Sequence, residues 1–161
     1  MTPFLAEHVL LIKWLHILSS TLLFGTGLGT AFHGLRGSIS GDLRAIAVTS
    51  RSVVVADWLF TTPAVILQPI TGVLLALAQG WPLTTPWLML SLGLYALAGA
   101  CWLPVVWLQI QMQRLAAAAL AAGTDLPDTY RRYFRLWFAL GWPAFSAVMA
   151  VFYLMVVKPD L

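Results

Sequence analysis

The feature that most constrains the fold is a long stretch without charged side chains. No Asp, Glu, Lys or Arg occurs between Asp57 and Arg114. Over the whole chain of 161 residues, 60% are hydrophobic and 9% are charged, whereas soluble domains carry roughly 25% charged residues. Water cannot solvate such a surface. The sequence therefore predicts an integral membrane protein, with one membrane domain over residues 1–161.

Four hydrophobic segments are long enough to cross a bilayer. A helix of about 20 apolar residues spans the hydrocarbon, and helices are expected because the backbone finds no water there. The sequence therefore predicts an all-α fold, a transmembrane four-helix bundle. The expected spans are residues 9–32, 53–78, 87–108 and 136–157.

The distribution of basic residues predicts the orientation. The arginines lie in or beside the first and third connections, whereas Lys13 and Lys158 lie toward the opposite side. Because cytoplasmic loops carry an excess of basic residues, we expect both termini on the outer, periplasmic side of a bacterial inner membrane. The net charge of +3 then reflects topology and contact with the lipid bilayer and its anionic headgroups, and not nucleic-acid binding.

Lys13 and His16 place an ammonium group and an imidazole one turn apart in the first span. Ionisable side chains are costly in hydrocarbon, so they usually face a bundle interior and mark a site. Counting from the span ends puts Gln68, Tyr95 and Met149 near the level of His16. We expect these five residues to line a cofactor pocket.

Three interpretations of His16 stand beside one another. It is an axial ligand to haem b, with Lys13 near a propionate; or it hydrogen-bonds a neighbouring helix while Lys13 extends toward water; or it belongs to a proton relay.

His8, His16 and His33 all precede the second span. His8 and His16 lie ~12 Å apart along the helix, so two histidines of one chain do not clasp one haem. The opposing ligand would be a methionine, water, nothing, or a residue of another subunit.

Two further features predict helix contacts. Asp57 begins the second span, and Arg135, at the start of the fourth, is its expected ion-pair partner. Arg51 is a local alternative, and a carboxylate is also favoured at a helix N-terminus by the dipole. Gly25 and Gly29 form a G-x-x-x-G motif, which predicts close packing of the first span against a second helix.

Several stretches of the first two spans resemble an uncharacterised bacterial family described as predicted integral membrane proteins. More distantly, the pattern from Lys13 to His16 is similar to that of HemJ-type protoporphyrinogen oxidases, small helical membrane proteins that bind haem b. This resemblance implies a haem role for His16 and a supporting one for Lys13. This chain contains no counterpart of the later motifs of the HemJ-type family. The stretches shared with the first family are Lys13–Ser20, Phe24–Phe32, Asp57–Trp58, Thr61–Pro63 and Gln68–Gly72.

These observations favour an inner-membrane b-type haem protein, in electron transfer or in oxidation of a small hydrophobic substrate. A membrane electron-transfer partner or a homo-oligomer fits that function. One alternative is a non-enzymatic accessory subunit that packs through Gly25 and Gly29. Another is a small proton-linked transporter that uses Lys13, His16 and Asp57. Cys101 is the single cysteine, which excludes an intrachain disulfide and a cysteine-based metal cluster.

Overall fold

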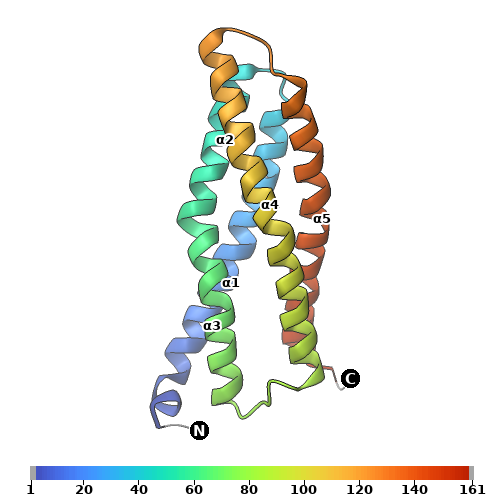
Figure 1. The fold of residues 1–161 in the computed structure, drawn as a ribbon. Helices are drawn as coiled ribbons and strands as arrows, with labels where there is room; N and C mark the ends of the chain where they lie inside the picture. Colours follow the sequence, from blue (N-terminus) through green and yellow to red (C-terminus); the bar gives the residue numbers. More distant parts are fainter. Residues whose placement is uncertain (1–2, 160–161) are drawn as a thin grey trace.

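The computed structural model describes residues 3–159, with side chains from residue 7 onward, and the chain folds into long helices packed side by side (Figure 1). Four helical segments are long and apolar enough to cross a membrane, which confirms the all-α, four-span fold. The π-helical turn η1 joins α2 and α3 into one segment. The elements are α1 (Pro3–Ser38), α2 (Leu43–Ala56), η1 (Asp57–Thr61), α3 (Thr62–Ala78), α4 (Pro86–Ala122) and α5 (Asp128–Val157).

The helices extend beyond the predicted spans at one end. The segment Leu43–Ala78 contains 36 residues, or ~54 Å of helix at 1.5 Å per residue, against a hydrocarbon thickness of ~30 Å. At its start, the Asp42 carboxylate caps α2 by accepting a hydrogen bond of 2.9 Å from the Arg44 N–H. Gly123, with φ of 64°, ends α4 in the left-handed conformation that glycine tolerates best. These extensions contain charged and polar residues among apolar ones, so the hydropathy of the predicted spans does not include them.

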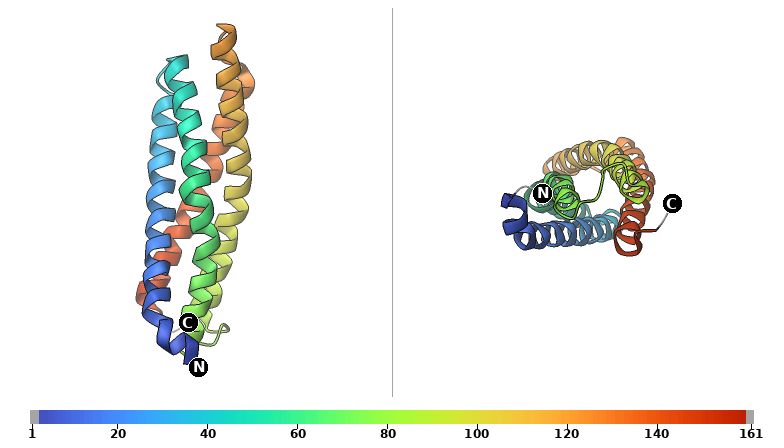
Figure 2. Two further views of the ribbon diagram at one scale, coloured as in Figure 1. Left: turned by 90° about the vertical axis from the view of Figure 1, so that its left-hand side faces the viewer. Right: turned by 90° about the horizontal axis from the view of Figure 1, so that it is seen from below.

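Both termini lie at the same end of the bundle (Figure 2). We call this the terminal end; it holds the start of α1, the connection 79–85 and the end of α5. The opposite end holds the connections 39–42 and 123–127. We call it the arginine end, because its helix ends and connections carry the arginines: Arg36, Arg44, Arg51, Arg114, Arg131, Arg132 and Arg135.

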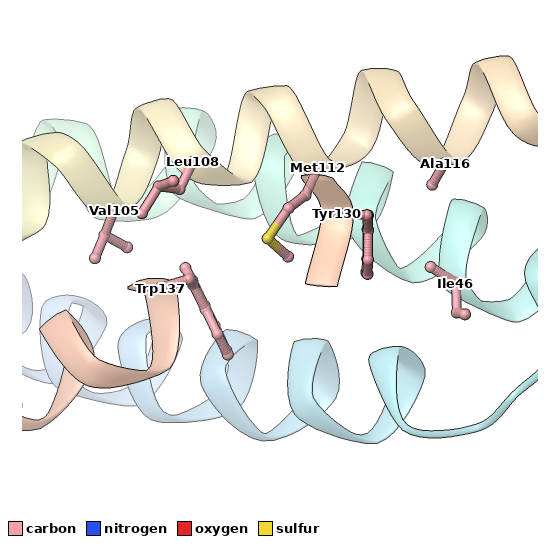
Figure 3. Packing of buried hydrophobic residues seen from close by; sticks show 7 residues of the cluster. All are labelled: Ile46, Val105, Leu108, Met112, Ala116, Tyr130 and Trp137. Carbon is pink, nitrogen blue, oxygen red and sulfur yellow. The ribbon is translucent and has the colours of Figure 1, made fainter. Parts of the chain in front are cut away.

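The main hydrophobic core lies in the half of the bundle toward the arginine end. There α1 packs against α2, and α4 packs against both α2 and α5. Side chains from α2, α4 and α5 lie in a row along the bundle, with Trp137 and Val105 at one end and Ile46 and Ala116 at the other (Figure 3). The cluster consists of Ile46, Val105, Leu108, Met112, Ala116, Tyr130 and Trp137.

A smaller cluster closes the terminal end. Trp87 and Leu154 are buried there with Ala76 and Leu88, which joins α3, α4 and α5. The Lys158 ammonium group lies 5.7 Å from the ring of Trp81 and 5.8 Å from that of Trp87. A cation over an indole face is attractive, so the end of α5 is held against the connection between α3 and α4.

Close helix packing falls on glycines other than those predicted. A Cβ added to Gly37 would lie 2.6 Å from Thr49, so α1 and α2 approach closely there. Within the described part of the chain, a Cβ at Gly25 or Gly29 would meet no neighbouring heavy atom within 4 Å. The structure therefore differs from the expectation for the G-x-x-x-G motif, because α1 turns other faces toward α2 and α3.

Candidate functional site

His16 projects from α1 toward α3, and both of its ring nitrogens have partners there. Nδ1 lies 2.8 Å from the Thr71 hydroxyl, and Nε2 lies 3.2 Å from the Gln68 amide nitrogen. Thr71 donates its own hydroxyl hydrogen to the carbonyl of Leu67 at 2.7 Å. The Gln68 amide nitrogen can only donate, so Nε2 accepts from it and the Thr71 hydroxyl accepts from His16 Nδ1–H. This network assigns the hydrogen to Nδ1 and leaves Nε2 as the acceptor for the Gln68 amide.

Ser19 and Gly72 complete the surroundings of this imidazole. Ser19 is 3% exposed, and its hydroxyl donates to the Gln68 side-chain oxygen at 2.5 Å. A Cβ on Gly72 would lie only 3.2 Å from Cε1 of His16, so a larger residue there would crowd the ring. The polar groups of Gln68 are thus engaged on both sides, as a membrane interior requires. We call His16, Ser19, Gln68 and Thr71 the histidine network.

The structure brings together two of the five residues predicted to line a cofactor pocket. His16 and Gln68 are in contact, whereas Lys13 is exposed. Met149 is 45% exposed on α5, so its thioether does not belong to the bundle interior. Tyr95 is half-buried and is engaged with another group.

Sequence reasoning missed Ser19 and Thr71, although a signal for both was present. Ser19 lies three residues after His16, and Thr71 lies three residues after Gln68. Residues at this spacing share a helix face. Two facing polar pairs on adjacent spans are therefore a pattern from which the histidine network could be predicted.

Tyr95 compensates for a proline in α3. Pro69 has no N–H and lies inside the helix, so the carbonyl of Val65, four residues earlier, has no helical donor. The Tyr95 hydroxyl donates to that carbonyl at 2.6 Å. This hydrogen bond connects α4 to α3 just before Gln68 and holds the irregular part of the helix that carries the histidine network.

A second polar cluster surrounds Asp57 in the π-turn η1. Asp57 is 4% exposed and accepts a hydrogen bond of 2.9 Å from the Thr61 hydroxyl. The Gln109 side chain on α4 lies beside this carboxyl group. The Asp57 backbone carbonyl accepts from the N–H and from the hydroxyl of Thr62. Such a π-turn relieves the clash that Pro63 would make with the preceding turn of a regular α-helix.

The partners of Asp57 differ from the predicted ones. Arg135 is exposed and lines a surface cavity at the arginine end, while Arg51 is also exposed. Asp57 instead contacts hydroxyl and amide groups. Gln109 is 6% exposed, and its buried oxygen has no hydrogen-bond partner in the described part of the chain.

The histidine network offers one donor atom to a haem iron. In the assigned tautomer, the lone pair of His16 Nε2 is the ligating electron pair, and a neutral amide from Gln68 occupies it. Among the described residues, no group of three or more His, Cys, Asp or Glu side chains gathers into a metal site. His16 therefore offers a single nitrogen lone pair, which is already paired with Gln68, while Met149 is exposed on α5.

The comparisons with known proteins identify the family. The model of a family described as predicted integral membrane protein (DUF2269) matches residues 10–159. The chain belongs to this family. The match confirms the resemblance of the first two spans and the expectation of a multi-pass membrane protein. Searches of curated proteins and of solved structures found no match, so the likeness to HemJ-type oxidases has no support beyond its motif.

We predict that the Tyr95 hydroxyl stabilises the fold because of Pro69. Tyr95→Phe should lower the free energy of unfolding by about 1 kcal/mol, the range of hydrogen bonds between membrane helices. Pro69→Ala restores an amide donor to Val65, so Tyr95→Phe should cost much less in that background. Unfolding of the purified protein in mixed micelles, followed by circular dichroism, measures both values. Tyr153→Phe, at a side chain that is 64% exposed, is the control. An equal cost of Tyr95→Phe in both backgrounds would contradict the coupling.

Proposed function

We propose that this protein binds haem b through His16 as its single axial protein ligand, and that it acts in membrane electron transfer or in oxidation of a small hydrophobic substrate. The tautomer of His16 carries this proposal. Thr71 holds Nδ1–H at 2.8 Å, which directs the lone pair of Nε2 into the helix interface. A histidine that ligates a metal ordinarily donates its other ring N–H to such an acceptor, which fixes the ring and its tautomer.

The residues around the imidazole have distinct roles in this proposal. Thr71 orients the ring, and Gly72 leaves room for it beside α3. Gln68 competes for Nε2, and Ser19 holds its amide oxygen. Haem bound there would supply one-electron redox chemistry, with a potential set by the axial ligand and the apolar surroundings.

An optical spectrum of the full chain tests the proposal. The protein is purified in detergent from haem-replete cells, and its spectrum is recorded before and after dithionite. We expect a Soret band that shifts on reduction and that His16→Ala abolishes. His33→Ala, which removes an exposed imidazole of the same helix, should leave the band unchanged. Thr71→Val should weaken haem affinity by roughly 10–100-fold, as loss of an orienting partner does, whereas Gln68→Leu should strengthen it.

Two results would overturn the haem proposal. One is a colourless, monodisperse wild-type protein that also fails to take up added haemin. The other is a Soret band that persists in His16→Ala with unchanged intensity and reduction behaviour.

We propose proton-linked transport through Asp57 as the second candidate function. It is favoured by the unpartnered Gln109 oxygen beside a carboxyl group in a π-turn. Intramembrane carboxyl groups mark ion and proton pathways, and single π-turns occur frequently at functional sites. Gln68 and Thr71 of the histidine network lie on the same segment of chain, farther toward the terminal end.

Proton flux into proteoliposomes tests this second function. With an imposed pH gradient and an entrapped pH-sensitive dye, we expect flux above that of empty liposomes, and Asp57→Asn should abolish it. Asp128→Asn removes an exposed carboxylate at the start of α5 and should leave the flux unchanged. Equal flux in both variants would exclude Asp57 from any pathway.

We also propose that the termini face the periplasm of a bacterial inner membrane. The arginine end carries the arginines, and basic residues concentrate on the cytoplasmic side. An alkaline phosphatase fused after Leu161, which is active only outside the cytoplasm, should therefore be active, and a green fluorescent protein at the same position should be dark. The reverse pair of results would overturn this orientation.

A further inference from the structure

A cavity of about 630 Å³ lies at the arginine end, away from the histidine network and from Asp57. Residues from the connection 39–42, the start of α2, the connection 123–127 and the start of α5 line it. Its volume is typical of small-molecule sites, which range over about 300–1,000 Å³. Nothing in the proposed functions uses this space.

The lining combines an ordered polar pair with apolar side chains. Tyr130 is 3% exposed, and its hydroxyl lies 2.9 Å from the hydroxyl of Ser38. This pair joins the end of α1 to the start of α5. Ile46 is buried in the main core, and it presents apolar surface to the cavity together with Phe134.

Two arginines give the cavity its charge. Arg131 and Arg135 both line it, and their spacing of four residues places them on one face of α5. In the part of the chain that the structure describes, neither guanidinium group forms an ion pair or a hydrogen bond within the chain. Asp125 is the acidic residue in the lining, and it is exposed on the connection before α5. The cavity therefore keeps a net positive charge with unused hydrogen-bond donors.

The sequence places the arginines of the cavity at the level expected for the headgroup layer. Arg135 directly precedes the apolar part of α5, whereas Asp125 lies in a connection outside the helices. The whole arginine end carries seven arginines against Asp42, Asp125 and Asp128 at its helix starts and connections. Basic pockets between helices at this level bind anionic lipid headgroups, and the planar guanidinium group matches phosphate oxygens in pairs.

We propose that this cavity binds the phosphate group of an anionic phospholipid, with Arg131 and Arg135 as the phosphate ligands and Phe134, at the same level of α5, against the glycerol backbone. The same phosphate chemistry occurs in soluble phosphate esters. Phe134 favours the lipid, because a free phosphate makes no use of this apolar side chain. The inference is independent of haem binding and of proton transport.

Thermal unfolding of the full-length protein in neutral detergent tests the site. A ligand that binds only the folded state stabilises it by RT ln(1 + [L]/Kd), so the unfolding temperature rises with ligand concentration. The probes are phosphatidylglycerol, phosphatidylcholine with the same acyl chains, and glycerol 3-phosphate. We expect phosphatidylglycerol alone to raise the unfolding temperature of the wild type and to be retained as a bound lipid in native mass spectrometry.

A charge-matched pair of variants separates the cavity from general attraction to the arginine end. Arg131→Gln with Arg135→Gln should weaken the apparent affinity for phosphatidylglycerol at least about tenfold, the loss expected for charge-assisted hydrogen bonds. Arg114→Gln with Arg132→Gln removes the same charge from exposed positions outside the cavity and should retain the shift. Unfolding temperatures without added lipid show whether both pairs fold equally well.

Three outcomes would overturn the proposal. Equal weakening in both pairs would assign lipid binding to the overall charge of this end. Phosphatidylcholine carries the same phosphate beside a cationic choline, so equal shifts with this lipid would mean that the net negative charge of the lipid is not recognised. An equal shift with glycerol 3-phosphate, lost in the Arg131 and Arg135 variant, would assign the cavity to a soluble phosphate ester instead of a lipid.

Discussion

The hydrocarbon interior imposes one constraint on which the rest of this structure depends: each polar group placed there must find its partner within the protein. The histidine network satisfies this constraint between α1 and α3. His16 uses both ring nitrogens, and Thr71 passes its own hydrogen to a backbone carbonyl of α3. Because these bonds cross between helices, they fix which face of α1 meets α3 as well as the level at which the two helices meet.

Prolines create the irregular backbone on which both polar clusters are built. Pro69 frees a carbonyl that Tyr95 recovers from the neighbouring helix, and Pro63 directly follows the π-turn that holds Asp57 and Thr61. At each irregular turn a hydroxyl group donates a hydrogen bond: Tyr95 to the Val65 carbonyl, and Thr61 to the Asp57 carboxylate. The segment that contains α2, η1 and α3 is therefore continuous enough to span the bilayer, yet it presents polar groups to the interior at two levels.

The fold could be predicted from the sequence because hydropathy and charge carry most of the information about spans. The approximate level of the site was also predictable, since counting along antiparallel helices placed Gln68 opposite His16. Rotation of each helix about its axis was not predictable. Gly25, Gly29 and Met149 therefore fall on faces that the bundle leaves open, and Asp57 meets α4 instead of Arg135 on α5. The positions of the arginines in the sequence likewise did not predict that Arg131 and Arg135 would line one cavity.

The hydrogen bond between Gln68 and His16 contributes little free energy, and this matters for ligand binding at His16. A hydrogen bond between membrane helices contributes about 0.6 kcal/mol on average, because the alternative states also find partners. Ligation of a metal by protein side chains contributes far more than this, so the amide is a weak competitor for Nε2. If a ligand displaced the Gln68 amide nitrogen from His16, the hydrogen bond from Ser19 to the Gln68 oxygen would remain. Only the amide N–H that had faced Nε2 would lose its acceptor. In this arrangement both ring nitrogens of His16 have hydrogen-bond partners when no ligand is present, and α1 and α3 stay in register. The imidazole already has the tautomer that ligation of a metal needs.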